Sequence, residues 1–75
     1  MLNITNLKID ECAVIEKIDS NLKAKIRLLE LGFVKGAFIK LLQISSLKKT
    51  YLVLIEGSVF ALRESVAKGV FVCKK

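Results

Sequence analysis

The chain has 75 residues, a length that fits one domain over residues 1–75. Its composition is 53% hydrophobic and 27% charged, which excludes a disordered chain. No apolar run approaches the ~20 residues of a membrane-spanning helix, and the first residues lack the order of a secretory signal, so we expect a cytoplasmic protein without membrane insertion. The net charge of +6 favours anionic partners, such as nucleic acid or an acidic protein surface.

The N-terminal part of the chain predicts one strand. Residues 11–19 are rich in β-branched and apolar types and are bounded by polar residues, as is typical of a short strand. The turn that follows offers three side chains that commonly cap the start of a helix: Asp19, Ser20 and Asn21.

After this turn the spacing of the apolar residues predicts a short amphipathic helix to about Leu31. The apolar residues at the spacing of one helix face, which we expect to be buried, are Leu22, Ile26 and Leu29. The polar residues that share this spacing and would form the outward face are Lys23, Arg27 and Glu30. Gly32 is placed to end the helix, because glycine readily adopts a positive φ.

The rest of the chain predicts further short strands. Residues 37–46 are apolar on both faces and fit a helix or a strand, and a polar connector precedes a strong strand at 51–56. Gly57 and Ser58 would turn the chain into a strand at 59–62, and a helical turn would separate it from a last strand at 70–73. The expected fold is therefore mainly β, a small barrel of about five strands with the short helix inserted between the first two.

The sequence lacks the groups on which the common catalytic mechanisms depend. It contains no histidine, no glycine-rich phosphate loop and no dinucleotide-binding fingerprint. The interior of so small a barrel is filled by its own side chains and leaves little room for a substrate. We therefore expect no catalytic residues, no cofactor and no enzymatic activity.

Two motifs resemble those of a known family. Residues 27–37 read R-L-L-E-L-G-F-V-K-G-A and are similar to the R-L-x-E-L-G-[LFM]-x-x-G signature of the ferrous iron transport protein A (FeoA) family. Residues 60–63 read F-A-L-R and resemble a second motif near the end of the family's sequence. The resemblance implies an SH3-like β-barrel, in which residues 37–46 form a strand. At the position of Lys35 the family often has proline. The lysine therefore adds a charge beside the signature.

The resemblance also implies a function and a partner. Members of the family are cytoplasmic proteins thought to work with ferrous iron transport protein B, a membrane permease that carries a cytoplasmic G-protein domain. We therefore expect a non-enzymatic accessory protein that docks on this permease. The candidate contacts are Lys23, Arg27, Glu30, Phe33, Lys35 and Arg63. Arg63 has a structural alternative, in which it caps a helix or pairs with Glu30 or Glu64.

Two other functions and an oligomer stay open. In a basic SH3-like module that binds nucleic acid, phosphates would contact Lys40, Lys48, Lys49, Lys74 and Lys75, and only Tyr51 lies near these cations for stacking. In a metal-binding protein, Cys12 and Cys73 would need Asp10 or Glu11 to complete the coordination. The alternative for both cysteines is a buried free thiol. Edge strands could also support a homo-oligomer.

Overall fold

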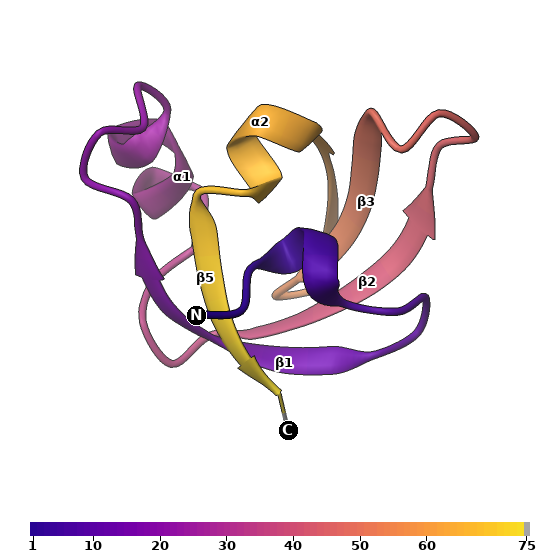
Figure 1. Ribbon diagram of the computed structural model, residues 1–75. Helices are drawn as coiled ribbons and strands as arrows, with labels where there is room; N and C mark the ends of the chain where they lie inside the picture. Colours follow the sequence, from indigo (N-terminus) through magenta and orange to yellow (C-terminus); the bar gives the residue numbers. More distant parts are fainter. Residues whose placement is uncertain (75) are drawn as a thin grey trace.

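The computed structural model describes residues 1–74, which form one five-stranded antiparallel sheet in the order β4-β3-β2-β1-β5 (Figure 1). The elements are a 3-10 turn η1 (Ile4–Asn6), β1 (Cys12–Ile18), α1 (Lys25–Glu30), β2 (Phe38–Ile44), β3 (Thr50–Ile55), β4 (Ser58–Arg63), α2 (Glu64–Ala67) and β5 (Val70–Lys74). The mainly β fold is thus as predicted, and residues 37–46 lie mostly in a strand. No helix among the described residues has the length and apolar character that crossing a membrane requires.

Alternation along the strands places one face of the sheet in the core. Buried apolar side chains alternate along much of β1, β2, β3 and β5, and β4 contributes Leu62; the set includes Ala13, Ile15, Ile39, Leu41, Val53, Ile55, Leu62, Val70 and Val72. The register shifts once in β1, between Ile15 and Lys17, and once in β2, between Leu41 and Gln43. Because such bulges increase the local twist and bend the strand, they curl the sheet around its core.

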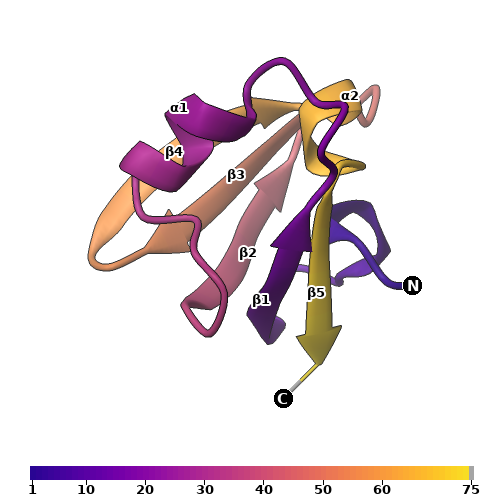
Figure 2. The same ribbon diagram turned by 90° about the vertical axis from the view of Figure 1, so that its left-hand side faces the viewer.

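The predicted barrel does not close through strand pairing. Figure 2 shows β4 and β5 at opposite borders of the curled sheet, and no ladder joins them within residues 1–74. Side chains from outside the sheet fill the core on the open side instead, among them Ile4, Leu7 and Ala67, which are all buried. Closure of the predicted barrel is therefore not confirmed, and apolar packing takes the place of strand pairing on this side of the core.

A two-residue turn connects β3 to β4. Ile55 pairs with Ser58 across Glu56 and Gly57, whose φ angles are 51° and 78°. Two successive positive φ values are those of a type I′ turn, which matches the twist of the strands on either side. The β3–β4 ladder continues without a register shift from this turn to the pair Thr50 and Arg63.

Helix α1 begins later than the sequence pattern predicts. Its first residue is Lys25, and its N-cap, Ala24, makes no side-chain cap hydrogen bond. Asp19 Oδ1 instead accepts a hydrogen bond of 3.0 Å from the amide of Asn21, which stabilises a turn after β1. A further turn follows, in which the Lys25 amide donates to the Leu22 carbonyl at 3.0 Å. The predicted caps are therefore wrong, because these turns separate them from the helix.

The end of α1 is a Schellman motif. The amide of Phe33 donates to the Leu28 carbonyl at 3.0 Å, and the amide of Gly32 donates to the Leu29 carbonyl at 3.1 Å. Gly32 has φ of 108°, a conformation that this motif requires and that glycine adopts without steric cost. The motif usually brings the residue after the glycine against the last turn of the helix, and here Phe33 and Leu28 are both buried.

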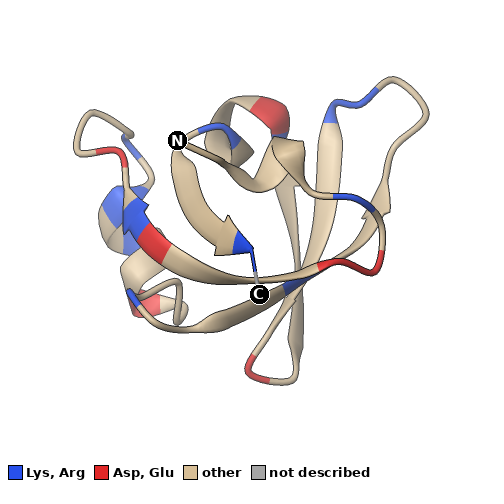
Figure 3. Cartoon of the chain, turned by 60° about the horizontal axis from the view of Figure 1, so that its bottom comes forward, with Lys and Arg blue, Asp and Glu red and all other residues tan. Residues whose placement is uncertain are grey.

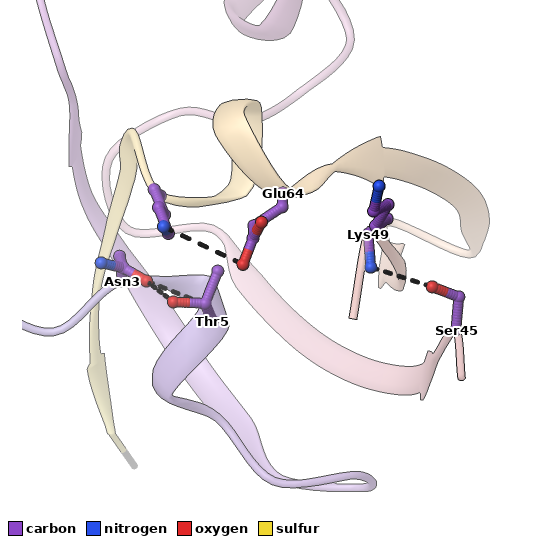
Figure 4. Close-up of polar contacts among 6 residues, drawn as sticks. Asn3, Thr5, Ser45, Lys49 and Glu64 are labelled. Atoms are coloured by element: carbon purple, nitrogen blue, oxygen red, sulfur yellow. Dashed lines mark hydrogen bonds and ion pairs between the residues drawn. The ribbon is translucent and has the colours of Figure 1, made fainter. Parts of the chain in front are cut away.

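The N-terminal segment covers the free side of β5. The Val72 amide donates to the Leu2 carbonyl at 2.9 Å, and Asn3 forms an isolated antiparallel bridge with Phe71. The Asn3 side chain also accepts hydrogen bonds from the amide and hydroxyl of Thr5, which hold η1 in place (Figure 4). One of the two borders of the sheet is thereby protected.

Glu11 joins the chain before β1 to the end of β5. Its Oε1 accepts a hydrogen bond of 2.8 Å from the Lys8 amide, and its Oε2 lies 3.3 Å from Lys74 Nζ. The Lys8 amide and, to a smaller extent, the Lys74 ammonium hold the pKa of Glu11 below its ordinary value of 4.5.

This lowered pKa predicts the pH dependence of a variant. The charged carboxylate contributes stability above the unfolded pKa, and this contribution is lost as the pH falls through the lower folded pKa. Glu11→Gln is therefore expected to lower the thermal midpoint at neutral pH, with the difference from the wild type vanishing in acid. Thermal melts across the acid range measure this, and a difference that stays constant well below pH 4.5 would contradict it.

Candidate partner-binding face

Helix α1 exposes apolar side chains that the sequence pattern assigns to the core. Ile26 is 72% exposed and Leu29 is 39% exposed, whereas Leu28 is buried. Residues of an α-helix are 100° apart around its axis, so Ile26 and Glu30 project away from Leu28, and Leu29 lies to one side of them. The prediction that Ile26 and Leu29 face the core is therefore wrong, and together they form an apolar centre on the surface.

Charged residues predicted as partner contacts lie on this helix and directly before and after it. Lys23, Arg27, Glu30 and Lys35 are all exposed, and Val34, in the loop after the helix, is 44% exposed. Figure 3 shows the cations on α1 and the neighbouring turns. None of these charged groups forms an ion pair in the part of the chain that the structure describes. We call the set Lys23, Ile26, Arg27, Leu29, Glu30, Val34 and Lys35 the α1 face.

Phe33 is not part of this surface. Its side chain is fully buried and meets Phe60 edge to face, with 5.4 Å between the ring centroids and 62° between the ring planes. The positive φ of Gly32 turns the chain back toward the core directly before Phe33. The prediction of Phe33 as a partner contact is therefore wrong, and its ring is a structural element of the domain.

Arg63 is exposed but lies apart from the α1 face, at the end of β4. It occupies the N-cap position of α2 and makes no side-chain cap hydrogen bond. No ion pair joins it to Glu30 or Glu64 within residues 1–74, and Glu64 instead lies 3.9 Å from Lys68 Nζ. The structural roles expected for Arg63 are thus not seen. It lines an open pocket of about 470 Å³ with Lys49, Thr50, Glu64 and Ser65.

The cations assigned to a nucleic-acid surface lie on separate parts of the molecule. Lys40 is on the outer face of β2, Lys48 and Lys49 are in the β2–β3 loop, and Lys74 is paired with Glu11. Lys75 lies outside the described residues. Tyr51 is only 3% exposed, so its ring presents no stacking surface for a base. Within residues 1–74, these cations and Tyr51 do not form the aromatic-lined groove typical of single-strand binders.

The two cysteines lie on neighbouring strands, and both are exposed, so the prediction of buried thiols is wrong. Cys73 pairs with Val14, two residues from Cys12, which places the thiols diagonally on the outer face of β1 and β5. The alternation that buries Ala13 and Val72 turns the cysteines outward. Among the described residues no group of three or more cysteines and carboxylates is arranged to hold a metal, and Glu11 is engaged with Lys8 and Lys74.

Solved structures of similar fold come from several proteins. FeoA of Chlorobium tepidum is 26% identical, with a TM-score of 0.89 over 97% of this chain and 70% of that protein. FeoA of Stenotrophomonas maltophilia, an SH3 domain protein solved with zinc and described as a candidate ferrous iron transport activating factor, is 33% identical, with a TM-score of 0.85 over 96% of this chain and 89% of that one.

A manganese-dependent transcriptional repressor shares the fold alone, at 12% identity and a TM-score of 0.87, over 99% of this chain and 41% of the repressor. No curated protein matches this sequence. The sequence profile of the FeoA domain matches residues 2–74, which include the helix signature, the F-A-L-R motif and all five strands. This chain therefore belongs to the FeoA family.

Proposed function

We propose that the protein is a non-enzymatic cytoplasmic accessory of ferrous iron transport, and that its α1 face docks on the cytoplasmic domain of the ferrous iron permease, ferrous iron transport protein B. Membership of the FeoA family supports the connection to iron transport. The description of the Stenotrophomonas maltophilia protein as a candidate activating factor is consistent with an accessory role.

The exposure of Ile26 is the observation that carries the proposal. A solvent-exposed isoleucine on a short helix, beside Leu29 and among unpaired cations, is the arrangement of an apolar centre within a polar rim that protein interfaces favour. The surplus of cations in this rim predicts an acidic surface on the partner. The apolar centre would supply the part of the affinity that salt does not screen.

Binding to the purified cytoplasmic domain of the permease tests this proposal. Ile26→Ser is expected to weaken the complex by about 30-fold, the effect of losing ~2 kcal/mol at the centre of an interface. The matched control is Leu47→Ser, since Leu47 is 75% exposed but lies in the β2–β3 loop. Titration calorimetry at physiological and high salt measures both variants.

The two salt conditions separate the proposal from the nucleic-acid alternative. Binding to the permease domain that persists at high salt, and that Ile26→Ser weakens more than Leu47→Ser, would support docking through α1. Equal losses in the two variants would contradict it. Binding to a short RNA alone, with an affinity that collapses as salt rises, would assign the basic surface to nucleic acid instead.

A further inference from the structure

Strand β4 has a free border whose backbone groups are available for pairing. In a two-residue hairpin the two residues that flank the turn exchange backbone hydrogen bonds, and the following pairs are alternately non-hydrogen-bonded and hydrogen-bonded. The backbone groups of Ser58, Phe60 and Leu62 therefore form hydrogen bonds with β3. The amides and carbonyls of Val59 and Ala61 point away from it, and no loop or cap hydrogen bond within residues 1–74 reaches them.

This border lacks the devices that usually protect an edge strand. Such strands are commonly blunted by lysine, proline or a bulge, or are covered by another segment. Strand β4 reads S-V-F-A-L-R, its ladder has no register shift, and Val59 is 53% exposed. The opposite border, β5, is covered by Leu2 and Asn3. Strand β4 is therefore the border of the sheet that a further strand can join.

A cationic pocket lies at the end of the same strand. Arg63 is the last residue of β4 and pairs with Thr50, the first residue of β3. Lys49 directly precedes Thr50, so the two cations line the same pocket at this end of the strands. Thr50 and Ser65 add hydroxyl groups to the lining. The one carboxylate of the pocket, Glu64, is directed to Lys68 and away from Lys49, as Figure 4 shows. Neither Arg63 nor Lys49 has an ion-pair partner among the described residues.

We propose that β4 binds an extended, acidic segment of a partner protein, which adds to the sheet as a further strand and places a carboxylate between Arg63 and Lys49. The main-chain bonds to Val59 and Ala61 supply affinity in such strand addition, and the carboxylate fixes position and direction. This inference goes beyond the α1 face, because it depends on β4 and the pocket alone and holds even if α1 binds nothing.

The charge of the pocket favours a partner protein over a second copy of this chain. Strand β4 carries no acidic residue. In an antiparallel pair of two β4 strands centred on Ala61, Arg63 would face the apolar Val59 of the other copy. Such a pair leaves the guanidinium without a carboxylate from the added strand, whereas an acidic segment neutralises it.

A short acetylated peptide of alternating threonine and valine that ends in aspartate with a free carboxylate is the probe. Hydrogen exchange followed by NMR reports each amide separately. In the free protein the amides of Val59 and Ala61 are expected to exchange quickly, while those of Phe60 and Leu62 are protected by β3. Saturating peptide is expected to slow exchange at Val59 and Ala61 and to leave Phe60 unchanged.

Charge-removing variants test the pocket. Arg63→Gln and Lys49→Gln are each expected to weaken peptide binding by about tenfold, because each removes a charge-assisted contact to the carboxylate. Lys8→Gln, which removes an exposed cation outside the pocket, is the matched control and should bind as the wild type does. Both pocket residues are exposed, so the variants are expected to keep the wild-type thermal midpoint.

Three results would overturn the proposal. The first is a peptide that slows exchange at neither Val59 nor Ala61. The second is peptide binding by Arg63→Gln and by Lys49→Gln that is as tight as peptide binding by the control, Lys8→Gln. The third is protection of Val59 and Ala61 that grows with protein concentration alone, together with a doubled mass in solution, which would assign the border to a second copy. None of these results bears on whether α1 binds the permease domain.

Discussion

Phe33→Ala is expected to destabilise the protein by about 3–5 kcal/mol, the usual cost of truncating a buried aromatic residue to alanine. The ring is fully buried and meets Phe60 edge to face. Its loss would leave a cavity next to Leu28, where the Schellman motif joins α1 to the core. Since small domains have a total stability of only about 5–15 kcal/mol, a large part of the stability would be lost.

Urea denaturation of the variant and the wild type measures this loss. Phe38→Ala is the matched control, because Phe38 is 60% exposed and its truncation opens no core cavity. A loss in Phe33→Ala no larger than that in Phe38→Ala would contradict the structural role of Phe33. The result also limits how binding data are interpreted, since weaker binding by Phe33→Ala would report unfolding rather than a lost contact.

Gly32→Ala is expected to cost about 1–3 kcal/mol for a different reason, which is backbone strain. An added Cβ would meet Ile55 Cγ2 at 3.7 Å, an ordinary contact, so crowding is not the cause. The φ of 108° is instead a conformation that a residue with a side chain rarely adopts. The variant must either hold this strain or release the Schellman motif, which would shift Phe33 out of the core.

The matched control for this prediction is Gly69→Ala. Gly69 has no positive φ, and the three atoms nearest to a Cβ there belong to the side chain of Leu22, the first of them at 3.0 Å. Leu22 is partly exposed and can move, so a smaller loss is expected. Thermal and urea unfolding of both variants compare the two effects, and an equal or larger loss in Gly69→Ala would show that crowding outweighs backbone strain.

The strands could be predicted because the residue types within them and the turn residues at their ends indicate the same segments. Runs such as residues 51–56 combine β-branched and apolar side chains with flanking turn residues, and the observed strand, Thr50–Ile55, differs by one residue at each end. Residues 37–46 needed the family resemblance, because their apolar residues lie on both faces and fit either periodicity. Closure of the sheet depends on where η1 and α2 pack, which no local pattern reports.

The orientation of α1 could not be predicted from periodicity. Leucine and isoleucine occupy positions 22, 26, 28, 29 and 31, so apolar side chains point in almost every direction around so short a helix. The helix begins only at Lys25, and Leu22, which set the expected phase, lies outside it. Packing of Leu28 against the core decides which side is exposed.

Burial of Phe33 had a signal in the sequence that the prediction did not use. A glycine that ends a helix is commonly followed by an apolar residue that packs on the last turn, and Gly32 followed by Phe33 fits this pattern. The exposure of Cys12 and Cys73 had no such signal, because their strands are apolar at successive positions and either face could have been the inner one.

The sheet contains strand pairs that are close together in the sequence and one pair, β1 with β5, that is far apart in the sequence. Strands β2, β3 and β4 follow one another through short connections, whereas β1 and β5 are joined across almost the whole described chain. The entropy lost on closing a loop rises with its length, and distant contacts slow folding. We therefore expect the β2–β3–β4 meander to form early and β5 to dock last. Until then the border of β1 that β5 later covers has no strand partner, even where β1 already pairs with β2. The interval before β5 docks is therefore the period in which newly made chains are most exposed to misassembly.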